Sequence, residues 1–370
     1  MAARTDAEDA EDRVIQQSLV RRLAGQSPLW ILAIDIGLIL LFGLISPGHV
    51  FFNSGNFTNM ALDSAEVVIL ATGLAFLLGA GELDISVGSN VILSSVLGGK
   101  VMVSMAGTHD QVLSGEYPHL TSALIVGIAV TLLSGVAFGL VNAFIVCGMG
   151  VNSFIATLGT LGIGQGLALV ISDGTNIEGI PGQLQTSFGV KDIFGVPLPA
   201  VIAIVVALVL WLILRSTRYG LRTLAIGSSR QAAARAGVGI DRHLVSLFAM
   251  VGLLAGIAGV FDLSRFATTN LSGHQTDALS AIAGAVIGGT KLFGGRASVI
   301  GAVFGATLAV ILETGLVIQG LSPFYQLIAV GVVLIVAVYI RGSDESDGKR
   351  RGAALRTLTT RARGGRKGSR

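Results

Sequence analysis

The stretch RSTRYGLRTLAIGSSRQAAARAGVGIDRH, residues 215–243, decides how the rest of the chain is oriented. It holds six arginines and one acid, Asp241, whereas the segments around it are long runs of Leu, Val, Ile, Ala and Gly. Arginine-rich loops of membrane proteins stay on the cytoplasmic side. We therefore expect residues 215–243 to form a cytoplasmic loop between two membrane-spanning segments.

A short helix is predicted within this loop, over residues 228–236. Ser228 or Ser229 is a suitable N-cap, and Gly237 is a suitable residue to end the helix. A short helix on the cytoplasmic face of a membrane protein indicates a surface on which another protein docks.

The composition is that of an integral membrane protein. Of the 370 residues, 52% are hydrophobic and only 13% are charged, with a mean hydropathy of +0.77; soluble domains carry about 25% charged residues. The 51 glycines favour closely packed helices, and the alternating pattern of a membrane β-barrel is absent. We predict an all-α polytopic membrane protein. Four small-residue pairs are predicted helix-packing positions: Gly135/Gly139, Gly252/Gly256, Gly284/Gly288 and Gly301/Gly305.

Ten segments are apolar and near the roughly 20 residues that a helix needs to cross a bilayer. They are 29–46, 60–80, 86–106, 121–147, 152–172, 198–215, 243–266, 276–291, 298–319 and 323–340. Ten spans place both termini on the cytoplasmic side. The connections then assigned to the outside contain one lysine, Lys191, and no arginine, which agrees with the positive-inside rule. The segment 276–291 is short, so a full span and a re-entrant segment both fit it.

The two ends of the chain are polar. Residues 1–28 begin with acids and continue with apolar residues at helical spacing, which fits an amphipathic helix on the cytoplasmic face or a frayed terminus, and not a cleavable signal peptide. Residues 341–370 are basic and rich in Gly, Ser and Arg, which indicates a disordered cytoplasmic tail attracted to anionic lipids rather than to nucleic acid. The membrane domain is therefore residues 29–340.

The sequence GELDISVG, residues 81–88, interrupts two apolar runs with two carboxylates. Carboxylates at membrane depth are costly, so they normally face a cavity or an interfacial turn. Asp84 and Ser86 could cap the following helix, or the break could be a discontinuous helix whose end faces a solute.

Polar side chains inside the spans have two interpretations, helix-to-helix hydrogen bonding and a pathway for a polar solute. The candidate pathway residues are Glu82, Asp84, Ser86, Asn142, Thr157, Thr160, Gln165 and Asp277, and Glu313 has the same character. An ion-coupled carrier that uses Glu82 and Asp84 is the alternative function.

Sequence motifs for catalysis are absent. The segment GGTKLFGGR, residues 288–296, lacks the Lys-Ser/Thr ending of a phosphate-binding loop, and we interpret it as a cytoplasmic turn. The five histidines lack metal-ligand spacing, and no nucleophile or dinucleotide motif is present. We expect no enzymatic activity, no metal and no cofactor.

Several motifs in this order resemble the permease subunits of bacterial ribose/xylose-type ABC importers, which belong to the branched-chain amino acid/ribose-type inner-membrane permease family. They are GELDISVGS at 81–89, NSFIATLGT at 152–160, GSSRQAAARAGV at 227–238 and GGTKLFGGRAS at 288–298. The resemblance covers residues 30–341. It implies a multi-pass protein of the bacterial cytoplasmic membrane that imports a monosaccharide or a similar small polar solute.

The resemblance also implies partners. A cytosolic ABC ATPase would hydrolyse ATP, an extracytoplasmic solute-binding protein would deliver the solute, and a second permease copy would complete the pathway. Residues 227–238 would be the ATPase-coupling loop, although Gln231 stands where the family usually has Glu. The residues implied in coupling are Arg230, Gln231, Ala232, Ala233, Arg235 and Gly237.

Overall fold

The computed structural model describes residues 28–274 and 276–322, together with residues 325, 328, 331 and 332. Within this part of the chain, eight helices are long and apolar enough to cross a membrane. They are α2 (Pro28–Ile45), α3 (Ser54–Gly79), α4 (Val87–Ala106), α6 (Leu120–Ala143, extended by a π-turn, η2, Phe144–Gly148), α7 (Ser153–Ile171), α9 (Leu198–Ser216), α12 (Ile240–Phe266) and α14 (Val299–Ile318).

The shorter elements lie at the ends of the long helices. They are η1 (Pro47–Phe52), α5 (His109–Leu113), α8 (Gly182–Leu184), η3 (Gln185–Gly189), the two-residue strands β1 (Asp192–Ile193) and β2 (Val196–Pro197), α10 (Arg218–Ser228) and α11 (Arg230–Arg235). The strands form one antiparallel pair that connects η3 to α9.

Eight of the ten predicted spans coincide with these long helices, and the prediction of an all-α membrane protein is confirmed. Of the two alternatives for 276–291, a full span is wrong, because the segment contains only the short helix α13 (Asp277–Ile287), which has 11 residues. At 1.5 Å per residue, α13 is about 16 Å long, roughly half the thickness of a bilayer core. The predicted span 323–340, the predicted segment 341–370 and all but the last residue of the predicted segment 1–28 fall outside the continuously described residues.

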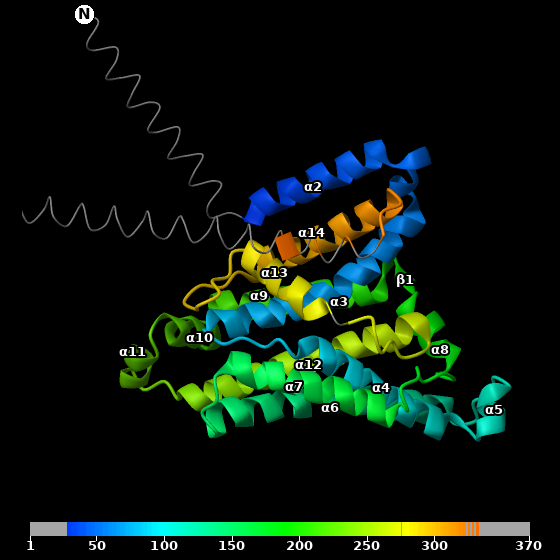
Figure 1. The fold of residues 1–370 in the computed structure, drawn as a ribbon, viewed down its shortest axis with the longest axis horizontal. Helices are drawn as coiled ribbons and strands as arrows, with labels where there is room; N and C mark the ends of the chain where they lie inside the picture. Colours follow the sequence, from blue (N-terminus) through cyan, green and yellow to red (C-terminus); the bar gives the residue numbers. More distant parts are fainter. Residues whose placement is uncertain (1–27, 275, 323–324, 326–327, 329–330, 333–370) are drawn as a thin grey trace, which may run out of the picture.

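The long helices lie side by side with their axes roughly parallel (Figure 1). One layer contains α2, α14, α13, α3 and α9, and the other contains α12, α4, α7 and α6. Helices α10 and α11 lie at one end of the bundle, and α5, α8 and β1 lie at the other. Helix α3 is central: all residues from 68 to 80 are buried, as expected for a helix that is apolar on every side.

Glycines allow two pairs of helices to pack backbone against backbone. A Cβ atom on Gly135 of α6 would lie 2.4 Å from the carbonyl oxygen of Gly252 on α12. A Cβ atom on Gly305 of α14 would lie 2.1 Å from the carbonyl oxygen of Gly284 on α13. The small-residue pairs predicted from the sequence therefore face one another, α6 against α12 and α13 against α14, and their packing role is confirmed.

Candidate functional site

Residues 80–86 connect α3 to α4 by a non-helical turn inside the bundle, as the motif at 81–88 predicted. Asp84 Oδ1 accepts hydrogen bonds from the backbone N–H of Ser86, at 2.8 Å, and from the Ser86 hydroxyl, at 2.6 Å. The carboxylate therefore fixes the turn from which α4 starts, and both side chains are at most 3% exposed.

Two other helices bind this turn. Asn142 of α6 donates from Nδ2 to Ser86 Oγ, at 2.8 Å, and to Asp84 Oδ2, at 3.3 Å. The hydroxyl of Thr160 on α7 donates to Asn142 Oδ1 at 2.7 Å. This chain of contacts, which we call the polar network, joins α4, α6 and α7, and all four side chains are buried.

The first turn of α7 holds the backbone of the same connection. The N–H groups of Leu83 and Ile85 donate to the hydroxyls of Ser153 and Thr157, each at 3.2 Å. Two of the four motif segments, 81–89 and 152–160, therefore contact each other. Because every Asp84 oxygen and both ends of the Asn142 amide have partners, the polar network stabilises a fixed arrangement.

The remaining predicted pathway residues lie elsewhere. Glu82 forms an ion pair with Arg230 of α11, and its side chain is 5% exposed. Gln165 reaches the carbonyl oxygen of Leu271 at 3.5 Å. Asp277 starts α13 on the other side of α3. The eight predicted residues thus comprise the four side chains of the polar network, Thr157, which binds the backbone of the same turn, and three separate positions.

A pocket of about 760 Å³ lies where α3, η2, α10 and α11 meet. Its walls include Glu82, Asn152, Ser229, Arg230 and Asp241. The predicted short helix is confirmed as α11: Ser229 is its N-cap and accepts from the N–H of Ala232, and Gly237 ends it at a φ of +79°.

Helix α11 has one buried and one exposed face. Ala233 is 4% exposed, whereas its neighbours Gln231, Ala232 and Ala234 are exposed. The preceding helix α10 was not predicted; Thr223 on α10 bonds to Nε2 of His243 on α12 at 2.8 Å. Helix α11 is therefore seated on the bundle through Ala233 and exposes Gln231, Ala232 and Ala234.

The turn 288–298 supports the same region. The N–H of Gly295 donates to the carbonyl oxygen of Gly79 at 3.0 Å, and a Cβ atom on Gly227 would lie 2.0 Å from that same oxygen. The end of α3, the end of α10 and this turn therefore pack backbone against backbone. As a result, all four motif segments of the chain meet at or beside the α3–α4 turn.

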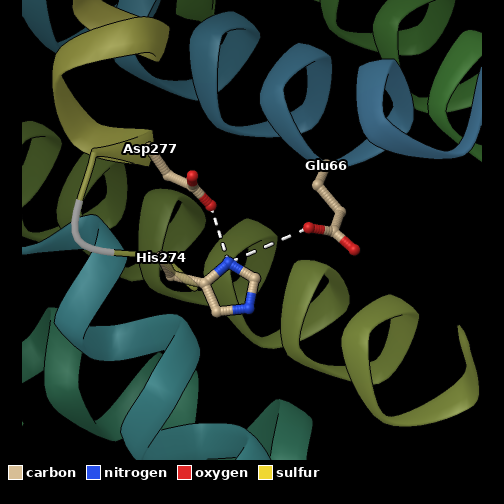
Figure 2. Close-up of side chains that lie close together, drawn as sticks. All are labelled: Glu66, His274 and Asp277. Carbon is tan, nitrogen blue, oxygen red and sulfur yellow. Dashed lines mark hydrogen bonds and ion pairs between the residues drawn. The ribbon is translucent and has the colours of Figure 1, made fainter. Parts of the chain in front are cut away.

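A second pocket, which we call the acidic pocket, has a volume of about 150 Å³ and lies between α3, α13, α14 and the end of α12. Within it, His274 Nδ1 lies 2.7 Å from Asp277 Oδ2 and 3.8 Å from Glu66 Oε2 (Figure 2). Behind it, His274 Nε2 lies 3.1 Å from Asp262 Oδ1. Arg265 pairs with Asp63 at the rim.

Sequence reasoning identified only Asp277 and Glu313 of this pocket. Glu66 of α3 and Asp262 of α12 are carboxylates inside apolar runs, and a systematic search for ionisable residues at membrane depth would have found them. His274 carries no such signal, because it lies in a connection and its partners come from three different elements.

A bundle of membrane-length helices that contains a fixed polar network and has a pocket toward each end is the architecture expected of a solute permease. Residues 56–338 match the family described as the branched-chain amino acid transport system permease component, and the chain belongs to that family. It is thus a multi-pass inner-membrane permease subunit and not itself an enzyme, as the resemblance of its motifs implied.

Individual relatives are named as sugar permeases. The D-allose transport system permease protein of Escherichia coli is 32% identical over 81% of this chain and 87% of its own length. The ribose import permease protein of Bacillus subtilis is 33% identical over 82% of this chain and 89% of its own. The galactose/methyl galactoside import permease protein of Haemophilus influenzae is 31% identical over 82% and 91%. No solved structure matches the chain.

Proposed function

We propose that this chain is the membrane-spanning subunit of an ATP-driven importer for a monosaccharide, and that a separate cytosolic ATPase acts on it through α11. The named functions of its relatives, allose, ribose and galactose import, support the substrate class. The alternative of an ion-coupled carrier requires Glu82 and Asp84 to be available to an ion, but both carboxylates are engaged within the protein.

The observation that carries the coupling proposal is the ion pair between Arg230 and Glu82. Arg230 is the first residue of α11, and Glu82 lies two residues before Asp84 in the α3–α4 turn. A displacement of α11 would therefore pull on the turn that Asn142 and Thr160 tie to α6 and α7. A partner that binds the exposed face of α11 can in this way move three long helices.

The proposal includes an orientation and partners. The end of the bundle with α10 and α11 faces the cytoplasm, and the end with α5, α8 and β1 faces outward, where a solute-binding protein would deliver the sugar. A second permease copy completes the pathway, and membrane lipids cover the apolar outer faces. The arginine content of residues 215–243 supports this orientation.

A bulky substitution on the exposed face of α11 tests the coupling proposal. We expect Ala232→Trp to abolish co-purification of the co-expressed ATPase and to lower ATP-driven uptake of labelled sugar by at least about tenfold, which corresponds to about 1.4 kcal/mol of lost docking free energy. Ser187→Trp, at an exposed position at the opposite end, is the matched control and should retain co-purification of the ATPase. Normal ATPase binding by Ala232→Trp would contradict the proposal.

A further inference from the structure

The acidic pocket contains more negative than positive charge. Asp63, Glu66, Asp277 and Glu313 line it, and Arg265 and His274 are its basic residues. Arg265 pairs with Asp63, which leaves the single imidazole of His274 among the remaining carboxylates. Ionised carboxylates at membrane depth are costly, and such residues normally have a partner or a bound ion.

Three potential ligand atoms converge at the inner wall of the pocket. Glu66 Oε2, His274 Nδ1 and an Asp277 carboxylate oxygen come from α3, the α12–α13 connection and the start of α13, and all lie within 4.8 Å of one another (Figure 2). Nitrogen and oxygen ligands lie about 2.0–2.2 Å from a bound Zn²⁺ ion, so two ligands of one ion are at most about 4.4 Å apart. Small side-chain rotations bring the three atoms to that spacing.

Asp262 supplies the independent observation. Its side chain is fully buried, and among the described residues neither of its carboxylate oxygens has a hydrogen-bond partner. Oδ1 nevertheless lies 3.1 Å from His274 Nε2, which also lacks a hydrogen-bond partner there. A histidine that binds a metal through one nitrogen almost always donates the N–H of the other to a carboxylate or a carbonyl. Asp262 stands where such a carboxylate is required.

The contact between His274 and Asp262 determines which charge is needed beside His274 Nδ1. If Nε2 carries the proton toward Asp262, the lone pair of Nδ1 points at the carboxylates of Glu66 and Asp277. A lone pair and two carboxylates repel one another unless a proton on Nδ1 or a cation lies between them. A divalent cation bound to all three atoms removes the repulsion and balances the excess charge of the pocket.

We propose that Glu66, His274 and Asp277 form a binding site for a divalent transition-metal ion of the Zn²⁺ or Mn²⁺ type, with Asp262 as the residue that positions His274. The imidazole nitrogen suits Zn²⁺, and the two carboxylate oxygens suit both Zn²⁺ and Mn²⁺. The remaining coordination positions face the pocket of about 150 Å³, which has room for water. The sequence suggested no metal site, because its histidines lack ligand spacing and the three ligands are far apart in the chain.

Direct metal binding tests the proposal on the full-length chain, purified in detergent and stripped with a chelator. We expect Co²⁺ to bind with one ion per chain, seen as new visible absorption bands, and Zn²⁺ to displace it. His274→Gln should abolish the bands, and Asp262→Asn should weaken Co²⁺ binding about 10–100-fold. Asp262→Asn keeps the side-chain size, so it remains informative if His274→Gln does not yield folded protein.

Glu313→Gln is the matched control. Glu313 is an exposed carboxylate of the same pocket and is not one of the three ligands. If the three ligands hold the ion, and not the summed negative charge of the pocket, Glu313→Gln should change the Co²⁺ affinity less than about threefold. Absence of one-to-one binding would mean that a proton alone occupies the site and would overturn the proposal. Equal affinities for the wild type and Asp262→Asn would do the same. Because the assay needs no ATPase, its outcome is separate from that of the coupling experiment.

Discussion

The backbone contact between α13 and α14 makes a quantitative prediction about Gly305→Ala. The new Cβ atom would lie 2.1 Å from the carbonyl oxygen of Gly284, whereas Cβ atoms keep at least 3.0 Å from such atoms, so the helices must separate by about 0.9 Å. The three nearest atoms all belong to the Gly284 backbone and cannot rotate away. Overpacking of this kind costs about 1–3 kcal/mol.

Gly162→Ala isolates this cost. Gly162 lies in the middle of α7, and among the described residues no atom other than those of its chain neighbours and of its own helix backbone lies within 4 Å of a Cβ atom built there. Both substitutions gain the same helix propensity, up to about 1 kcal/mol. The difference between the two variants in the free energy of unfolding should therefore be about 1–3 kcal/mol, with Gly305→Ala the less stable.

Unfolding of the purified variants in mixed micelles by increasing SDS, followed by far-ultraviolet circular dichroism, measures this difference. A difference of 1.4 kcal/mol is a tenfold change in the unfolding equilibrium constant, well within reach of such a titration. If Gly305→Ala were as stable as Gly162→Ala, α13 and α14 would not pack through their glycines, and the placement of Asp277 would have to be reconsidered.

Two more predictions concern the polar network and the orientation. Asn142→Ala removes three buried hydrogen bonds and should lower the free energy of unfolding by about 2–4 kcal/mol in the same titration. The control Gln165→Ala loses one contact of 3.5 Å and should lower the free energy of unfolding by less than about 1 kcal/mol. Equal effects of the two substitutions would contradict the network. The orientation can be tested after the free cysteine is removed by Cys147→Ser. A membrane-impermeant thiol reagent applied to intact cells should then label Ser187→Cys but not Ala236→Cys. The reverse labelling pattern would contradict the proposed orientation.

The positions of the long helices could be predicted because each one is an apolar run of membrane length. The predicted segments 29–46 and 298–319 became α2, Pro28–Ile45, and α14, Val299–Ile318, with boundaries shifted by one residue. Helix α3 begins at Ser54 instead of the predicted residue 60, because Asn53 caps it by accepting from the N–H of Gly55 and polar residues fill its first turns. Hydropathy cannot detect such a start, whereas a search for N-caps can.

Helix α10 was missed for a related reason. It is rich in arginine and lies outside the apolar runs, yet Thr217 caps it by accepting from the N–H of Gly220. The predicted segment 276–291 is longer than α13, which ends at Ile287. Residues 288–291 already belong to the glycine-rich turn that supports α3 and α10.

The candidate site was only partly predictable. Asp84 and Ser86 are neighbours in the sequence, so their joint role in the turn could be predicted. The contacts of Asn142 with Asp84 and of His274 with Glu66 each join a helix to a connection far away in the chain, and no periodicity in a single sequence reports such pairings. For the same reason the division of the predicted pathway residues between the polar network and three separate positions required the three-dimensional structure.

Helix α13 is a short rod with both ends anchored. Its first residue, Asp277, holds His274, and the turn that follows its last residue bonds through Gly295 to the end of α3 beside α10. With glycine contacts along α14 and an axis of only about 16 Å, the rod has little room to bend. We therefore expect any axial shift imposed at the turn 288–298 to reach the carboxylate of Asp277 nearly undiminished, so that the mouth of the acidic pocket changes shape whenever that end of the bundle is pushed.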